Sequence, residues 1–151
     1  MVTSRILIAF NGSPLSIKSL DIGLSLASLA EAEIALVTVV NPKDAISTVG
    51  GIRPKELLVE MRINAHHKLA AAVGKINPNR DPLDFLTEGD PATEIVRAAK
   101  EWGAQMIVLG FHPHSRLEGV LFGSTTEAVL QRAQCPVLVV PESTSASSLD
   151  W

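Results

Sequence analysis

Five short apolar runs divide the chain, and the segments between them carry apolar residues at helical spacing. The runs are RILIAF at 5–10, EIALVTVV at 33–40, LDFLTE at 83–88, MIVLG at 106–110 and PVLVVP at 136–141. The first, fourth and fifth runs are nearly continuous in apolar residues instead of alternating with polar ones. Continuous runs of this kind are typical of parallel strands that are covered on both faces.

Capping residues and apolar stripes predict a helix in each segment between the strands. Ser13 and Asp90 can each cap a helix whose first turn begins with proline. The predicted buried stripes are Ile17, Leu20, Leu24 and Ala27; then Leu58, Met61, Ala65, Leu69 and Ala72; then Ile95, Ala98 and Trp102. The second of these helices is expected to begin near Pro54, after a loop over 41–53, and the third to stop at Gly103.

The last helix is predicted from Ser124, which has the capping-box spacing to Glu127, and must end before Pro136. Strands and helices thus alternate along the chain. This order predicts an α/β fold, an open five-stranded parallel sheet that is doubly wound and Rossmann-like, with helices on both faces. We expect one domain over 1–141 and a disordered Ser-rich tail over 142–151.

Composition narrows the functional classes. The chain has 151 residues, 46% of them hydrophobic, which suits a single core. With 13 basic and 16 acidic residues and no basic face, nucleic-acid binding is not expected. No apolar stretch approaches the roughly 20 residues of a membrane helix, and the first residues do not form a signal peptide. With a single cysteine, these features favour a cytoplasmic protein that does not bind membranes.

The ligand crevice of such a sheet is expected beyond the carboxyl ends of the strands. The segments there are FNGS after the first strand, VVNP after the second and GFHPHS…FGST after the fourth. Neither a dinucleotide-binding G-x-G-x-x-G after the first strand nor a P-loop is found. Gly123 and Ser124 begin a helix whose free N–H groups suit an anion, although Ser124 is equally explained as an ordinary cap.

The chain resembles the universal stress protein family over essentially its whole folded length. The resemblance runs from RILIAFNGS through TEGDPATEIVRAAKEWGAQMIVLG to GSTTEAVLQRAQCPVLVVP. Nucleotide-binding members carry the pattern G-x2-G-x9-G-[ST]. Gly110 and Gly123-Ser124 match it at the right separation, and Pro113 stands at the second glycine position.

The resemblance implies a site for ATP or AMP across the ends of the first, second and fourth strands. By this resemblance Gly123, Ser124, Thr125 and Thr126 would hold phosphates, the backbone of Val39 would meet adenine, and Ala9, Asn11 and Gly110 would line the nucleoside. The family usually has aspartate where this chain has Asn11. An amide can replace a carboxylate toward ribose hydroxyls but not toward a cation, which weakens magnesium-dependent binding.

Pro113 leaves two interpretations open. Glycine would allow positive φ and a close approach to phosphate, whereas proline fixes φ at about −65° and lacks an N–H. The site could keep its nucleotide through the helix N-terminus, with charge from His112, His114 or Arg116. Alternatively, the domain is a nucleotide-free interaction module in which the altered loop and Asn11 contact a protein partner.

Metal binding and catalysis have little support in the sequence. His112 and His114 with Cys135 fall short of the four ligands of a closed zinc site, so no metal is expected. Cys135 is expected to be a small packing residue. No nucleophile stands beside an evident base, so the chain is not predicted to be an enzyme. The family resemblance further implies the strand order 3-2-1-4-5, which places 137–140 at an apolar sheet edge where a homodimer could form.

Overall fold

The computed structural model describes residues 4–46, 54–77, 79, 81–111 and 123–142. Its elements are β1 (Arg5–Ala9), α1 (Pro14–Ala30), β2 (Glu33–Val40), α2 (Pro42–Ile46), α3 (Pro54–Lys75), β3 (Leu83–Glu88), α4 (Pro91–Trp102), β4 (Met106–Phe111), α5 (Ser124–Arg132) and β5 (Val137–Pro141). All neighbouring strands pair in parallel, in the order β3-β2-β1-β4-β5. The predicted α/β fold and strand order are confirmed.

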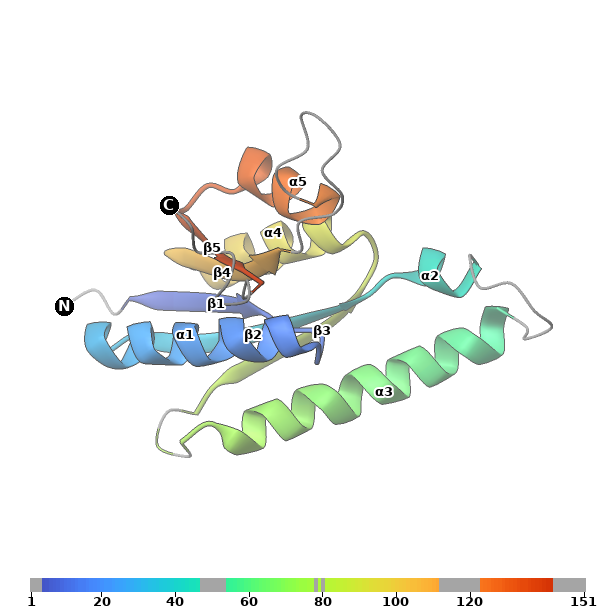
Figure 1. Ribbon diagram of the computed structural model, residues 1–151, viewed down its shortest axis with the longest axis horizontal. Helices are drawn as coiled ribbons and strands as arrows, with labels where there is room; N and C mark the ends of the chain where they lie inside the picture. Colours follow the sequence, from blue (N-terminus) through green and yellow to red (C-terminus); the bar gives the residue numbers. More distant parts are fainter. Residues whose placement is uncertain (1–3, 47–53, 78, 80, 112–122, 143–151) are drawn as a thin grey trace, which may run out of the picture.

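Two hydrophobic layers enclose the sheet, with α1 and α3 on one face and α4 and α5 on the other (Figure 1). Alternate residues of β1 divide between them: Ile6 and Ile8 pack toward α1 and α3, and Leu7 packs toward α4 and α5. The central strands are therefore buried on both faces, which explains their continuous apolar runs.

Most predicted caps and stripes are present. The side chain of Ser13 accepts a hydrogen bond from the Ser16 N–H at 3.1 Å, and Asp90 accepts one from the Thr93 N–H at 3.1 Å. Gly103 ends α4 in the left-handed conformation at φ 76°. In α3 the predicted stripe supplies the less exposed side chains, with Leu69 and Ala72 buried in the core.

The predictions for the stretch 41–53 and for Ile17 are wrong. The stretch 41–53, predicted as loop, contains α2, and Ile17, predicted to face the core, is 42% exposed. The buried face of α1 includes Ser16, Ser19 and Gly23 instead. Small residues occupy this face because α1 lies close to the sheet: a Cβ on Gly23 would come within 2.5 Å of the Ile8 Cδ1 atom.

Two further observations concern membrane-spanning helices and the predicted tail. In the described part of the chain, no helix is both long enough and apolar enough to cross a membrane. The tail predicted over 142–151 lies outside the described residues from position 143 onward.

Close packing of α1 against the end of β4 generates a stability prediction. A Cβ on Gly110 would lie 2.5 Å from the Leu15 Cγ and 3.0 Å from the Ser19 Oγ. We expect Gly110→Ala to lower the free energy of unfolding by about 1–3 kcal/mol through overpacking. Gly74→Ala is the control, because nothing lies within 4 Å of its Cβ and alanine favours a helix. Urea denaturation measures both; a Gly110→Ala protein as stable as wild type would contradict the packing.

Candidate functional site

At the carboxyl edge of the sheet, the central strand β1 ends before its two neighbours, β2 and β4. Its register with β2 ends at Ala9–Val37, and its register with β4 ends at Ile8–Val108. Meanwhile β2 continues to Val40, paired with β3, and β4 continues to Phe111, paired with β5. A gap therefore opens above β1, with β2 and β4 as its two sides.

Three hydrogen bonds direct the chain away from the sheet after β1. The Phe10 N–H donates to the Val37 carbonyl at 2.9 Å, and the buried Thr38 hydroxyl then donates to the Phe10 carbonyl at 2.7 Å. The Asn11 Oδ1 accepts the Ser13 N–H at 2.9 Å, the pattern of an Asx-turn. Gly12 completes the turn at φ 84°, which glycine adopts without strain.

This early end leaves backbone groups of Val39 directed into the gap. The carbonyl of Val37 points toward β1, where it meets Phe10, and the carbonyl of Val40 points toward β3, where it meets Gly89. Backbone groups of successive strand residues alternate between the two neighbouring strands. The N–H and C=O of Val39 therefore point toward the β1 side, beyond the last pair of that ladder.

A cavity of about 380 Å³ occupies the gap and extends between α4 and α5. Eight of the predicted site residues line it: Ala9, Asn11, Val39, Gly110, Gly123, Ser124, Thr125 and Thr126. The other two, His112 and Pro113, lie outside the described residues, as do His114 and Arg116. Residues from three strand ends and α5 thus come together in one cavity, as the topology predicted.

The cavity meets the N-terminus of α5 on its β4 side. Gly123 is the N-cap, and the Glu127 N–H donates to its carbonyl at 3.0 Å. Ser124 is the first helical residue, so its predicted role as the cap is wrong. As in any α-helix, the first-turn N–H groups at Ser124, Thr125 and Thr126 have no intrahelical partner, and Gly123 has no side chain that could cap them. They give this end of the cavity a positive potential.

The remaining lining residues were not predicted individually, although Phe10, Ser13, Asn41 and Phe111 belong to the strand-end segments that were expected here. Most are apolar or small: Phe10, Ser13, Leu15, Ser16, Val37, Asn41, Pro91, Ile95, Leu109 and Phe111. Val37 and Leu109 belong to the core layer beside α4 and α5, so alternation along β2 and β4 was the signal that could have identified them. Asp44 also lines the cavity, from α2. It was missed because its segment was predicted to be loop.

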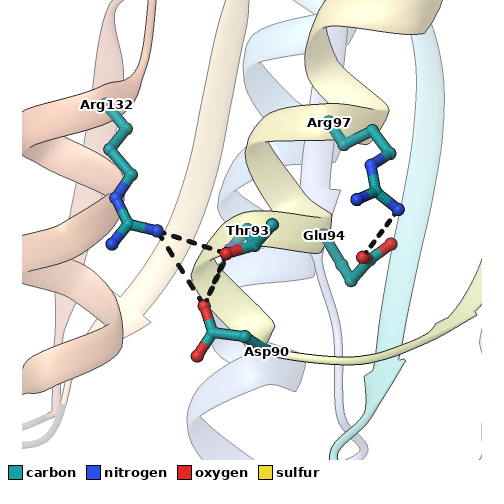
Figure 2. A network of polar contacts seen from close by, with 5 residues as sticks. All are labelled: Asp90, Thr93, Glu94, Arg97 and Arg132. Atoms are coloured by element: carbon teal, nitrogen blue, oxygen red, sulfur yellow. Dashed lines mark hydrogen bonds and ion pairs between the residues drawn. The ribbon is translucent and has the colours of Figure 1, made fainter.

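A polar network joins the start of α4 to the end of α5 (Figure 2). The Asp90 carboxylate accepts the Thr93 hydroxyl at 2.8 Å, and the Arg132 Nη1 donates to the Thr93 Oγ1 at 3.2 Å and lies 4.0 Å from the Asp90 Oδ2. Hydrogen bonds from the Thr93 hydroxyl and N–H lower the pKa of Asp90, with smaller contributions from Arg132 and Lys43. These contacts fix the two helices whose first turns line the cavity.

Cys135, His66 and His67 do not line this cavity. Burial raises the pKa of the Cys135 thiol, which packs against the core layer beside α4 and α5, as expected. It lines a second cavity of about 340 Å³ with Val96, Lys100 and Ile107 among others. His66 and His67 are exposed on α3. Across the described ranges, no three His, Cys, Asp or Glu residues are grouped as metal ligands would be.

The chain is similar to proteins of one known family. The model of the universal stress protein family matches residues 3–141. The universal stress protein YxiE of Bacillus subtilis is 30% identical over 147 residues, covering 91% of this chain and 98% of the relative.

Two solved structures share the fold. Protein MJ0577 of Methanocaldococcus jannaschii superposes with a TM-score of 0.71 at 24% identity, covering 96% of this chain and 100% of the other. A universal stress protein in complex with cAMP superposes with a TM-score of 0.62 at 22% identity, covering 95% and 100%.

The lowered pKa of Asp90 generates a pH prediction. A carboxyl with a lowered folded pKa stabilises the fold above its unfolded pKa of about 3.9, and this contribution is lost as the pH falls through the folded pKa. An asparagine in its place would remain a good cap without the charge. We therefore expect Asp90→Asn to lower the melting temperature at pH 7 and the difference from wild type to shrink below about pH 4. Thermal unfolding of both proteins measures it, and a pH-independent difference would contradict the assignment.

Proposed function

The chain belongs to the universal stress protein family, and on that premise we propose that it binds an adenine nucleotide, ATP or AMP, in the cavity above β1. Binding would serve stress response or signalling through a homodimer. One observation carries the proposal: the N-terminus of α5, which suits an anion, and the backbone groups of Val39, which lie beyond the end of the β1 ladder, face the same cavity. The α5 N-terminus and Val39 lie on opposite sides of β1, so the phosphate of a nucleotide could bind on one side and its base on the other.

The β4 side of the cavity suits phosphate. The first turn of α5 supplies N–H donors and the hydroxyls of Ser124 and Thr125, and the helix dipole favours negative charge there. The buried Thr126 directs its hydroxyl at the Gly110 carbonyl at a long 3.5 Å, which links this turn to the end of β4. Gly110 contributes only backbone atoms to the cavity. A side chain at this position would point toward α1.

The β2 side suits a purine. The N–H and C=O of Val39 offer one donor and one acceptor, which match an acceptor and an amine on the edge of adenine. Val37 of β2 and Ile95 of α4 provide apolar surface for the ring. The relative solved with cAMP carries an adenine nucleotide on the same fold, which supports this class of ligand.

Binding at this site is expected to be independent of magnesium. The Asn11 Oδ1 already accepts the Ser13 N–H, so Asn11 presents mainly its amide N–H groups to a ligand. Such donors suit sugar oxygens and not a cation. We assign a binding role and not catalysis, because Asp44 is the only side chain with an acidic or basic group among the described lining residues.

The open edge of β5 is the proposed dimer interface, over Val137 to Val140. The Ile107 N–H donates to the Pro136 carbonyl across β4 and β5, so by alternation Val137 and Val139 direct their backbone groups to the open edge. An apolar edge with free backbone groups is suited to pairing with a second copy.

Ser124→Asp tests the phosphate end of the cavity. A carboxylate in the first turn complements the helix dipole, so stability should be unchanged or higher by about 0.5 kcal/mol. The same charge repels phosphate, so we expect the affinity for ATP and AMP to fall about tenfold or more. Isothermal titration calorimetry, with and without magnesium, measures the affinities.

Ser124→Asn is the control, because it changes the side chain at similar size without adding charge. Equal binding by wild type and Ser124→Asp would contradict the phosphate site. Absence of bound nucleotide in freshly purified protein, together with no heat at millimolar ATP or AMP, would favour the nucleotide-free interaction module instead.

Val139→Pro tests the interface, because proline removes an N–H that points out of the sheet and leaves the pairing with β4 intact. We expect wild type to sediment as a dimer and the variant as a folded monomer. Val139→Ala keeps the N–H and should remain dimeric. A dimeric Val139→Pro protein in sedimentation velocity would place the interface elsewhere.

A further inference from the structure

We infer that Asp44 is a specificity-determining residue of this cavity, accepting a hydrogen bond from a donor on the nucleoside end of the ligand. The donor is an exocyclic amine of the purine or a ribose hydroxyl. This inference rests on the proposed function and adds to it, since Asp44 would discriminate between nucleotides that have the same phosphates but different nucleosides.

The fold fixes Asp44 at the mouth of the cavity. The Asn41 Oδ1 accepts the Lys43 N–H at 3.1 Å, and the Asn41 carbonyl accepts the Asp44 N–H at 3.0 Å, so β2 passes directly into α2 through a closed turn. The next residue, Ala45, is only 3% exposed. Anchored on both sides, Asp44 itself stays exposed while lining the cavity.

Charge divides the cavity into two unlike ends. Asp44 is the only charged side chain among the described residues that line it, and it lies on the β2 side. The N-terminus of α5, with its positive dipole, lies on the β4 side, and β1 separates the two. A ligand with phosphate at α5 therefore presents its nucleoside, which carries the hydrogen-bond donors, toward Asp44.

The chemistry of the neighbouring groups gives Asp44 a distinct role. Asn11 and the first turn of α5 offer mainly donors to a ligand, whereas a carboxylate only accepts. Its two oxygens provide about four acceptor positions, so Asp44 can accept a ligand hydrogen bond beside the interactions it makes within the protein. Among the described lining side chains, it alone is a charged acceptor.

The test measures AMP binding to wild type, Asp44→Ala and Asp21→Ala by calorimetry. Asp21 is a matched exposed helical aspartate on α1, outside the cavity. We expect Asp44→Ala to weaken AMP binding about tenfold, as for a hydrogen bond to a charged group, and Asp21→Ala to leave it unchanged. Circular dichroism confirms that both variants fold.

Three AMP analogues identify the donor: purine riboside 5′-monophosphate, 2′-deoxy-AMP and 3′-deoxy-AMP. The analogue that lacks the relevant donor should bind wild type and Asp44→Ala equally, and the others should keep the tenfold difference. Equal AMP binding by wild type and Asp44→Ala, or an equal loss for AMP and all three analogues, would overturn the role of Asp44 and leave the nucleotide site standing. No AMP or ATP binding to wild type would overturn both.

Discussion

The early end of β1 is the constraint on which the site depends. The Thr38 hydroxyl holds the Phe10 carbonyl at 2.7 Å, and the turn through Asn11 and Gly12 carries the chain away before its neighbours end. Because β2 and β4 continue, their backbones and side chains become the walls of a cavity. A longer β1 would pair with Val39 and close the same space.

The helices complete the cavity because right-handed crossovers bring their first turns to this edge. The first turns of α1, α4 and α5 all contribute lining residues. The network of Asp90, Thr93 and Arg132 joins α4 to α5, while close contact at Gly110 and Gly23 sets α1 against the sheet. Packing on both faces therefore positions the polar groups at the edge.

The sequence predicted the fold well because three of its five strands are nearly continuous apolar runs and its α1 and α4 caps are strong local signals. It also brought Asn11, Val39 and Ser124 to one edge, since strand ends meet there in any parallel sheet. It failed where local signals were weak or ambiguous. The buried face of α1 is made of small residues that hydropathy does not mark, and α2 is too short for a stripe. Asp44 was not predicted as a lining residue, because the helix that carries it was not predicted.

The central claim is that the cavity above β1 binds the two ends of an adenine nucleotide on opposite sides. Titration of ¹⁵N-labelled protein with AMP, followed through the backbone amide resonances, tests this directly. We expect the amides of Val39 and of Ser124 to Thr126 to shift together and to saturate at one ligand concentration. Shifts confined to other regions, such as the second cavity at Cys135, or no shifts at saturating AMP, would contradict it.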